Sequence, residues 1–360
     1  MVQQLSTNTF GTAKWIVSST LSNGTHTTIA SALTSASSGE TIFIRPGTYT
    51  ENLTLKAGVN LAAYVCDSPS GQVTISGKCS YSSAGQVNIS GINLQTNSDY
   101  ALEVTGSAAS RVFLNECRVT NTNNTAINFT SSSASATIYL NYCSTAVGAT
   151  NALFTSSSAG SINFWWCLMS SGSTTASSIS AGAMQMSNCY CAESMSFSGT
   201  AQMIIFNSSI RTFGRNITCV TMTGTSSGFI ANSLIQSGTA SAISVGSQVI
   251  VTGCTIYTSN ANAITGAGTI SYAGLDFGNT SSTINTTTQT VLNSGPRIQF
   301  GNGVAGTGGC QAMSGTGSPS GAVTAPKGSL FLRTDGSGVN DRAYINTDAG
   351  TTWTAIVTVA

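Results

Sequence analysis

One short pattern of apolar residues recurs along the middle of the chain and limits its fold more than any other feature. At residues 112–119 it reads Val-Phe-Leu-Asn-Glu-Cys-Arg-Val: alternating apolar residues, two turn residues, a small residue, a spacer and a last apolar residue. The small position is filled in successive repeats by Ile92, Cys117, Cys143, Cys167, Cys189, Ser208, Ser233 and Cys254. From position 92 to position 254 the chain takes seven steps over 162 residues, a mean period of about 23. A fixed period of this size indicates a solenoid, a propeller or an array.

The content of each repeat selects the solenoid. A shorter strand-like segment precedes the main pattern, as at residues 101–104, 126–129, 195–197 and 220–222. Apolar residues that alternate with polar ones are typical of strands, and no repeat contains an amphipathic helix. Two or three short strands per 23 residues predict an all-β fold, a single-stranded parallel β-helix over residues 40–277. The handedness rule for parallel crossovers predicts that it is right-handed.

The residue before the small position predicts how each repeat bends. It is Gly91, Asn188, Asn207, Asn232 or Gly253 in five of the eight repeats. Glycine and asparagine tolerate a left-handed backbone, which a tight bend between two strands requires. The other three repeats depart from this rule, with Glu116, Tyr142 and Trp166 at the same position.

Charge is scarce throughout the chain. Only 6% of the residues are charged, against roughly a quarter in ordinary globular proteins, and the net charge is +1. Nucleic-acid binding needs clustered lysine and arginine, so it is not expected. Residues 1–20 lack the basic start and apolar run of a secretory signal, and no stretch approaches the ~20 apolar residues of a membrane span. We therefore expect synthesis and assembly in a cytoplasm, without membrane insertion.

The cysteines follow the repeat. Spacings of 26, 24 and 22 residues separate Cys117, Cys143, Cys167 and Cys189, and the chain has ten cysteines in all. We expect these side chains to fill a small inward position as free thiols, as buried cysteine often does. Two alternatives remain open. Neighbouring coils could bring the cysteines within disulfide range, or a few could bind a metal.

The start of the repeat region resembles a known opening. Residues 27–36 predict a short helix, and residues 39–53 read Gly-Glu-Thr-Ile-Phe-Ile-Arg-Pro-Gly-Thr-Tyr-Thr-Glu-Asn-Leu. This sequence is similar to the first coil of pectinesterase-like and pectate-lyase-like proteins over residues 27–64. The resemblance implies a right-handed parallel β-helix whose first coil is covered by a helix, because an open end exposes apolar core and unpaired backbone. Such a fold does not by itself imply a function.

The end of the chain differs from the repeats. The pattern decays after Phe277, residues 278–321 are rich in glycine, serine and threonine and predict a neck or linker, and residues 322–360 predict three short antiparallel strands. That last segment resembles a terminal module of phage tail fibres and tailspikes. The matching residues are Ala325, Pro326, Gly328, Ser329, Leu330, Phe331, Arg333, Asp335, Gly336, Tyr344, Ile345 and Trp353. The resemblance implies a homotrimer. Phe331, Tyr344 and Trp353 are candidates for its interface, because so small a module buries little core alone.

The sequence offers little for catalysis. Glycoside hydrolysis needs two carboxylates ~5 to 9.5 Å apart, yet Glu193 is the only acid in residues 120–275. The densest charges elsewhere are Asp99, Glu103, Arg111, Glu116 and Arg118, which we interpret as solvated surface groups. We predict no catalytic residue, no cofactor and no metal ligand.

Trp165 and Trp166 are the candidate binding residues, either for a glycan or for another subunit, and one of the pair could instead belong to the core. The combined features predict a structural and binding subunit of a trimeric virion or phage-like tail fibre or spike. We expect it on the particle surface, attached to a host-surface glycan or protein and, through residues 1–39, to other virion proteins. The alternatives are a polysaccharide-degrading enzyme of the tailspike type, or a cell-surface adhesin or filament subunit.

Overall fold

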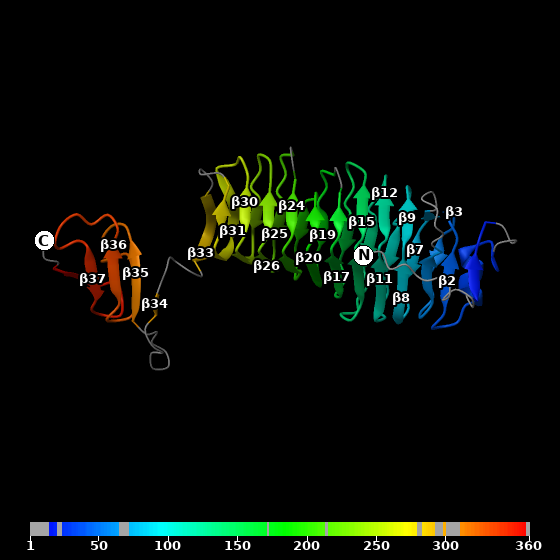
Figure 1. Cartoon of the computed structure of the whole chain (residues 1–360), viewed down its shortest axis with the longest axis horizontal. Coiled ribbons are helices and arrows are strands. Elements are labelled where there is room, and N and C mark those ends of the chain that lie inside the picture. The colour runs from blue at the N-terminus through cyan, green and yellow to red at the C-terminus, as the bar shows by residue number, and fades with distance from the viewer. Residues whose placement is uncertain are drawn as a thin grey trace. The chain divides into compact units, whose positions relative to one another are not determined.

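The structure is a computed structural model that describes residues 14–19, 24–64, 72–170, 173–212, 215–278, 283–291, 298–299 and 310–357. The chain divides into two compact units, Met1–Thr290 and Val291–Ala360. The first unit is a parallel β-solenoid, which confirms the predicted fold class (Figure 1). Part of the segment expected to contact other virion proteins, residues 1–13 and 20–23, lies outside the described residues.

Two sheets make up the solenoid. Sheet A contains β1 (Trp15–Val17), β2 (Thr41–Ile44), β4 (Leu53–Thr54), β5 (Asn60–Ala63), β7 (Cys79–Tyr81), β8 (Gly85–Ser90), β10 (Leu102–Val104), β11 (Ser110–Asn115), β13 (Ile127–Phe129), β14 (Thr137–Asn141), β16 (Phe154–Ser156), β17 (Ser161–Trp165), β19 (Ser177–Ile179), β20 (Ala183–Ser187), β22 (Met195–Phe197), β23 (Gln202–Phe206), β25 (Val220–Met222), β26 (Ser227–Ala231), β28 (Ile243–Val245), β29 (Gln248–Thr252), β31 (Asn262–Ala273) and β33 (Thr283–Val291). Sheet B contains β3 (Gly47–Tyr49), β6 (Val73–Ser76), β9 (Ile92–Thr96), β12 (Arg118–Asn121), β15 (Ser144–Val147), β18 (Leu168–Met169), β21 (Tyr190–Cys191), β24 (Ser209–Arg211), β27 (Leu234–Gln236), β30 (Thr255–Tyr257) and β32 (Asp276–Phe277).

Each complete coil contributes two strands to sheet A and one to sheet B. In the coil of β10, β11 and β12, Val112 pairs in register with Val87 of the coil before and Ile138 of the coil after. Leu114 is aligned in the same way with Ile89 and Leu140. All six side chains are fully buried, because every second residue of a strand points inward and like residues of successive coils stack.

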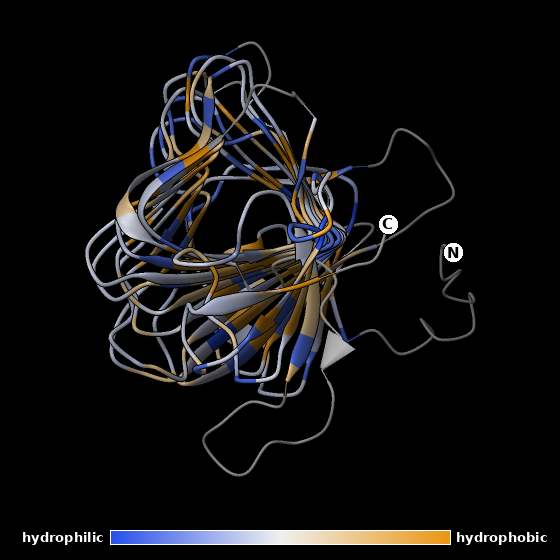
Figure 2. Cartoon of the chain, turned by 90° about the vertical axis from the view of Figure 1, so that its left-hand side faces the viewer, coloured by the Kyte–Doolittle hydropathy of each residue, from blue (hydrophilic) through white to orange (hydrophobic). Residues whose placement is uncertain are grey.

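The apolar core therefore runs along the inside of the solenoid as continuous columns. Figure 2 looks along the stack and shows the strands of successive coils superposed, one behind another. Burying an apolar side chain contributes roughly 1.5 to 3 kcal/mol, so a single coil cannot offset the entropy lost in ordering its backbone. Stability depends on the neighbouring coils.

A short helix covers the first coil, as predicted. Helix α1 (Ile29–Ser35) buries Ile29, Ala32 and Leu33, and the Thr28 hydroxyl accepts a hydrogen bond from the backbone N–H of Ser31. The Glu51 carboxylate accepts two more, from the backbone N–H groups of Ile29 and Ala30, each at 2.9 Å. These contacts satisfy donors that the first helical turn leaves unpaired.

The second unit is a small sheet of its own, sheet C. Its strands are β34 (Ile298–Gln299), β35 (Gln311–Gly315), β36 (Leu330–Arg333), β37 (Ala343–Asn346) and β38 (Trp353–Ile356). The last three strands are antiparallel, as predicted, but β35 pairs with β36 in parallel, so the sheet is mixed. The connection over residues 316–329 is long enough to bring the chain back to the starting edge before β36 begins. Part of the segment predicted as a neck is thus a strand.

Candidate functional site

The bends between sheet A and sheet B build the candidate site. From the bend between β8 and β9 to the bend between β31 and β32, each adopts the left-handed backbone conformation, whatever residue it holds. The φ values are Gly91 70°, Glu116 54°, Tyr142 53°, Trp166 55°, Asn188 54°, Asn207 46°, Asn232 48°, Gly253 58° and Gly274 58°. The three bends that departed from the sequence rule therefore keep the same geometry as the others.

Those three bends are energetically unfavourable. For a residue that is neither glycine nor asparagine, the left-handed conformation costs roughly 1 to 2 kcal/mol, since the Cβ atom crowds the following carbonyl. Glu116, Tyr142 and Trp166 carry this cost in three consecutive coils. Strained residues of this kind cluster at functional sites, where the side chain itself is needed.

The three strained side chains project outward. Tyr142 is 64% exposed and Trp166 is 55% exposed. Their rings are nearly parallel, with 7° between the planes and 6.2 Å between the centroids. An exposed pair of aromatic rings held in one orientation is a ready contact surface for a sugar ring or another flat apolar group.

These side chains border a hollow of about 600 Å³ on the sheet B side of the bends, which we call the bend groove. Its lining residues are Gln72, Gly91, Ile92, Asn93, Glu116, Cys117, Arg118, Tyr142, Cys143, Ser144, Thr145, Ala146, Trp166, Leu168 and Ser170. Amide, hydroxyl and charged groups thus lie among aromatic and apolar ones, a mixture that suits a polar ligand with flat faces.

The charges of the bend groove are free. Glu116 and Arg118 are both exposed, and neither forms an ion pair or a side-chain hydrogen bond with another described residue. Glu116 is the only carboxylate among the lining residues, and Arg118 the only cation. Besides its neutral amides and hydroxyls, the groove therefore offers one negatively charged hydrogen-bond acceptor and one positively charged donor.

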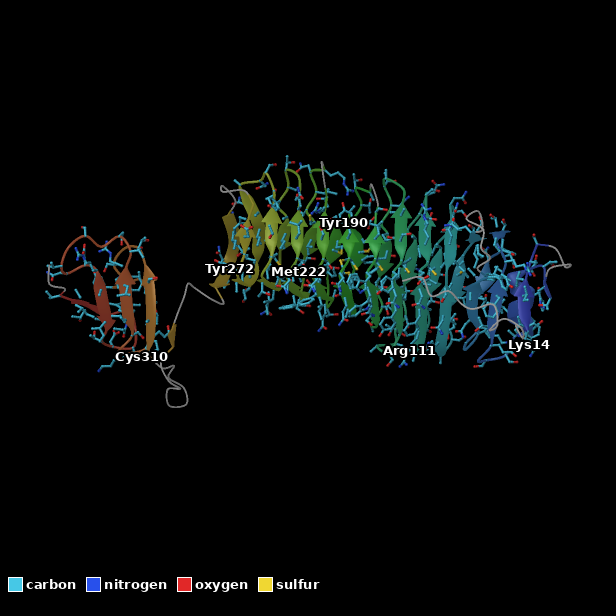
Figure 3. The ribbon with its side chains drawn as sticks, viewed as in Figure 1. Lys14, Arg111, Tyr190, Met222, Tyr272 and Cys310 are labelled. Carbon is cyan, nitrogen blue, oxygen red and sulfur yellow. The ribbon has the colours of Figure 1, made fainter. Side chains whose placement is uncertain are left out.

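Thiols lie beneath the groove. Cys117, Cys143, Cys167 and Cys189 stack one per coil, are at most 4% exposed, and are free thiols, as the sequence predicted. Yellow sulfur atoms in Figure 3 lie within the ribbon rather than at its outline. Cys66, the tenth cysteine, lies outside the described residues. Contacts with the thiols of Cys117 and Cys167, together with burial, raise the pKa of the Cys143 thiol above its ordinary range. Cys143 is only 2% exposed and therefore acts as a packing residue.

The structure separates the two candidate tryptophans. Trp166 is at the bend and lines the groove, whereas Trp165 ends β17 and is 38% exposed on the outer face of sheet A. Neither belongs to the core. Sequence reasoning missed Tyr142 as a site residue, although its departure from the bend rule was the available signal.

The charges that appeared close in sequence are also separated. Lys78 bridges Asp99 and Glu103, with Nζ–O distances of 2.9 and 3.2 Å. Only Glu116 and Arg118 of the five line the groove. The side-chain contact with Lys78 holds the pKa of the Asp99 carboxyl below its usual value, so this group acts as an ion-pair partner. Within the described part of the chain, no cluster of three or more histidine, cysteine, aspartate and glutamate side chains is arranged to hold a metal.

The trimer candidates lie in the core of sheet C. Phe331, Tyr344 and Trp353 are 5%, 8% and 6% exposed in a single copy. The rings of Phe331 and Trp353 meet edge to face at 5.9 Å, and the Trp353 indole N–H donates to the Val323 carbonyl at 2.7 Å. The opposite face carries exposed Leu332, Ile345 and Ile356. A role for the first three residues between subunits stays a prediction.

Comparisons with known proteins give likenesses to solved structures only. No protein-family model and no curated protein sequence matches the chain. The chain is similar to pectin methylesterase PemA from Erwinia chrysanthemi, at 11% identity over 76% of this chain and 92% of that one, with a TM-score of 0.39. The corresponding values are 9%, 78%, 89% and 0.41 for pectin methylesterase from carrot, and 13%, 78%, 91% and 0.36 for the enzyme from Aspergillus niger. At these identities the likeness says nothing about the chemistry of this chain. No helix among the described residues is long and apolar enough to cross a membrane.

Proposed function

We propose that the chain is a structural and binding subunit of a virion tail fibre or spike, and that its bend groove holds a polysaccharide of the host surface. The observation that carries the binding role is the strain at Glu116, Tyr142 and Trp166. Asparagine or glycine serves the same bend in the other coils, so backbone geometry does not account for these three side chains. Their shared position on the bend groove accounts for them.

The groove favours binding over cleavage. Two-carboxylate hydrolysis of a glycosidic bond needs a second acid ~5 to 9.5 Å from the first. Glu116 has no such partner among the lining residues. Aromatic rings, amides and hydroxyls are instead the groups by which a protein holds a sugar chain without reacting with it.

The test compares two adjacent tryptophans. The protein is titrated with purified cell-surface polysaccharides in a calorimeter. For one that binds, Trp166→Asn is expected to weaken affinity by up to roughly tenfold, since an aromatic contact contributes up to about 1.5 kcal/mol. Trp165→Ser is the matched control and should leave affinity unchanged, because its register partner Ser187 shows that serine fits there. Equal effects of both substitutions, or no binding to any polysaccharide, would refute the binding role.

The fibre role rests on the resemblance of the C-terminal segment to tail-fibre modules and on the apolar outer face of sheet C. In that face Leu332 and Ile356 are both cross-strand neighbours of Ala343, so they lie in one row. Exposed apolar rows on so small a sheet favour association, and three copies around one axis would cover them. We propose a homotrimer, assembled in the cytoplasm and carried on the particle surface.

Mass measurement in solution tests the trimer. The full chain is expected at three times 36.6 kDa. Leu332→Glu combined with Ile345→Glu should yield monomers, because like charges would meet across the contact. Phe331→Ala is a poor probe, since it removes the core of sheet C itself. A monomeric full chain, or a trimer that survives the double substitution, would contradict the assembly proposed here.

A polysaccharide-degrading enzyme is the second candidate, favoured by the exposed carboxylate of Glu116 and guanidinium of Arg118, which both line the groove. A carboxylate beside a guanidinium can remove or deliver a proton at a bound sugar. Release of reducing ends or unsaturated products, abolished by Glu116→Gln and unaffected by Glu103→Gln, would establish it. Glu103 is the control because its carboxylate is already held by Lys78.

A further inference from the structure

A second hollow opens near the far end of the solenoid. It measures about 470 Å³ and is lined by Arg215, Asn216, Gln236, Ser237, Gly238, Thr239, Tyr257, Thr258 and Ser259. Arg215 and Asn216 lie between β24 and β25, and the other residues come from the ends of β27 and β30 and from the turns that follow these two strands. We call this hollow the distal hollow.

The distal hollow is rigid and suited to a polyhydroxylated ligand. The Thr258 hydroxyl donates to the carbonyls of Gly238 and Ala240 at 3.1 and 2.7 Å, which fixes the turn. Tyr257 is 39% exposed, and a Cβ atom placed on Gly278 would lie 1.7 Å from its ring. The backbone of Gly278 therefore packs directly against the ring and holds it. An oriented aromatic ring with an amide and several hydroxyls nearby repeats the chemistry of the bend groove.

Register places both hollows on the same surface. The outward column of sheet B runs through Arg118, Ser144, Leu168, Tyr190, Ser209, Leu234 and Thr255, each the in-register partner of the next. Arg118, Ser144 and Leu168 line the bend groove. Gln236 and Tyr257 follow two residues after Leu234 and Thr255, so they point to the same outer face. The strands of this sheet lie side by side along the solenoid in Figure 1.

Between the two hollows, the outward column consists of Tyr190, Ser209 and Leu234, all half-buried. Four register steps separate Leu168, in the bend groove, from Thr255. At roughly 4.8 Å per step they span about 19 Å. Tyr190, labelled in Figure 3, is half-buried on this path. Arg211 lies along the sheet, since its Nε donates to the Ser209 hydroxyl at 2.8 Å.

We propose that the bend groove and the distal hollow are two subsites for a single strand of an unbranched polysaccharide that lies along the outer face of sheet B, parallel to the solenoid axis. This inference rests on the proposed binding function and names its ligand class. The ligand is an extended chain with a repeating unit, not a single terminal sugar. A ligand with a repeating unit suits this surface, because each coil contributes one outward residue to the column at nearly constant spacing.

The experiment measures affinity against chain length. Oligosaccharides of increasing length are cut from a polysaccharide that binds, and the dissociation constant is measured for the wild type and for Tyr257→Ala, Trp166→Asn and Tyr139→Ala. Affinity is expected to rise sharply once an oligosaccharide can span about 19 Å, since the second contact then becomes intramolecular. Tyr257→Ala should weaken long chains roughly tenfold and leave short ones unchanged. Trp166→Asn should weaken both.

Tyr139→Ala is the matched control, because Tyr139 lies on the outer face of sheet A, where its ring stacks on Phe113 at 4.6 Å. Gly278→Ala is a second variant, which displaces the Tyr257 ring without removing it and should reproduce the Tyr257→Ala result. If Trp166→Asn weakens binding but Tyr257→Ala does not affect chains of any length, the extended-chain inference fails and the proposed function stands. If no oligosaccharide or polysaccharide binds the wild type, both fail.

Discussion

Two stretches of the solenoid share one backbone and differ in what they put on it. In the coils of residues 110–170, the left-handed bends hold Glu116, Tyr142 and Trp166. In the coils of residues 183–252, the same bends hold three asparagines, at 188, 207 and 232. The paired strands on either side keep the same register throughout.

The inward column differs between the stretches as well. The residue after the bend is Cys117, Cys143, Cys167 and Cys189, and then becomes Ser208 and Ser233. Serine is satisfied there because Ser208 Oγ donates to the Phe206 carbonyl at 2.8 Å and accepts from the Cys189 N–H at 3.2 Å. In the later coils, the bends hold residues that the left-handed backbone favours. In the earlier coils, beside the bend groove, they hold residues that this conformation disfavours.

The largest effect on stability is expected from a substitution at a later bend that disfavours the left-handed conformation. Asn207→Val should lower the free energy of unfolding by roughly 2 to 3 kcal/mol, because a branched Cβ is strongly disfavoured in the left-handed conformation that Asn207 adopts. Urea denaturation measures the change. Asn207→Gly is the control and should lie close to the wild type. A valine variant as stable as the wild type would mean that the bend can relax.

The inward column offers the next contrast. Ser208→Ala should cost about 1 to 2 kcal/mol, since it leaves the buried Cys189 N–H without its acceptor, whereas the Phe206 carbonyl still accepts from the Asn188 N–H. Cys143→Ser should cost less than about 1 kcal/mol, because its sulfur already faces the Asn141 carbonyl at 3.4 Å and a hydroxyl can donate to it. Thermal and urea unfolding of the two variants compare them. A larger loss for Cys143→Ser would show that the thiol column cannot adopt the serine arrangement.

A smaller effect, of opposite sign, is expected at the earlier bends. Glu116→Asn should raise the free energy of unfolding by about 1 kcal/mol, since it relieves strain and removes no ion pair. Trp166→Asn should change it by less than about 0.5 kcal/mol, because the relief is offset by loss of the stack with Tyr142. Destabilisation by Glu116→Asn would indicate a structural role for this side chain and would weaken the functional interpretation of the bends.

The smallest effect on the stability of the central coils is expected from lowering the pH, which acts mainly on sheet C and on the first coil. The Arg333 side chain and the Gly317 N–H lower the pKa of Asp335 to about 2. Lys14, Ser37 and Trp15 lower the pKa of Glu40 to about 2. Carboxyls with a depressed folded-state pKa stabilise the fold above their unfolded pKa, near 4, and lose this contribution as the pH falls towards 2. Sheet C and the first coil should therefore weaken over this window.

The central coils should respond less, since Glu193 is the only acid in residues 120–275. Thermal unfolding at pH 7 and pH 2.5, followed by Trp353 fluorescence in a chain whose other tryptophans are phenylalanine, reports on sheet C. Asp335→Asn should reduce its pH dependence. If the stability of the central coils, followed by amide exchange, fell between pH 7 and pH 2.5 as much as that of sheet C, the contrast between the two regions would be contradicted.

The sequence predicted the solenoid because its determinants are local and repeated. Alternation fixes which side chains point inward, and the period fixes which of them stack, as the columns of Val87, Val112 and Ile138 show. The helix over residues 27–36 and the inward cysteines were predictable for the same reason. Trp166 was identified as a candidate because an aromatic side chain exposed on a solenoid can stack on a sugar ring.

The tertiary structure alone decided which side chains share a surface. Trp165 and Trp166 are adjacent in the chain, yet the left-handed backbone of Trp166 turns one side chain to the groove and leaves the other on sheet A. In sheet C, the pairing of β35 with β36 contributes Met313 to one face, which buries Phe331, Tyr344 and Trp353 and leaves Leu332, Ile345 and Ile356 outside. Alternation in a sequence gives the two faces of a strand. Only long-range pairing, between segments that the sequence leaves far apart, determines which of those faces becomes covered.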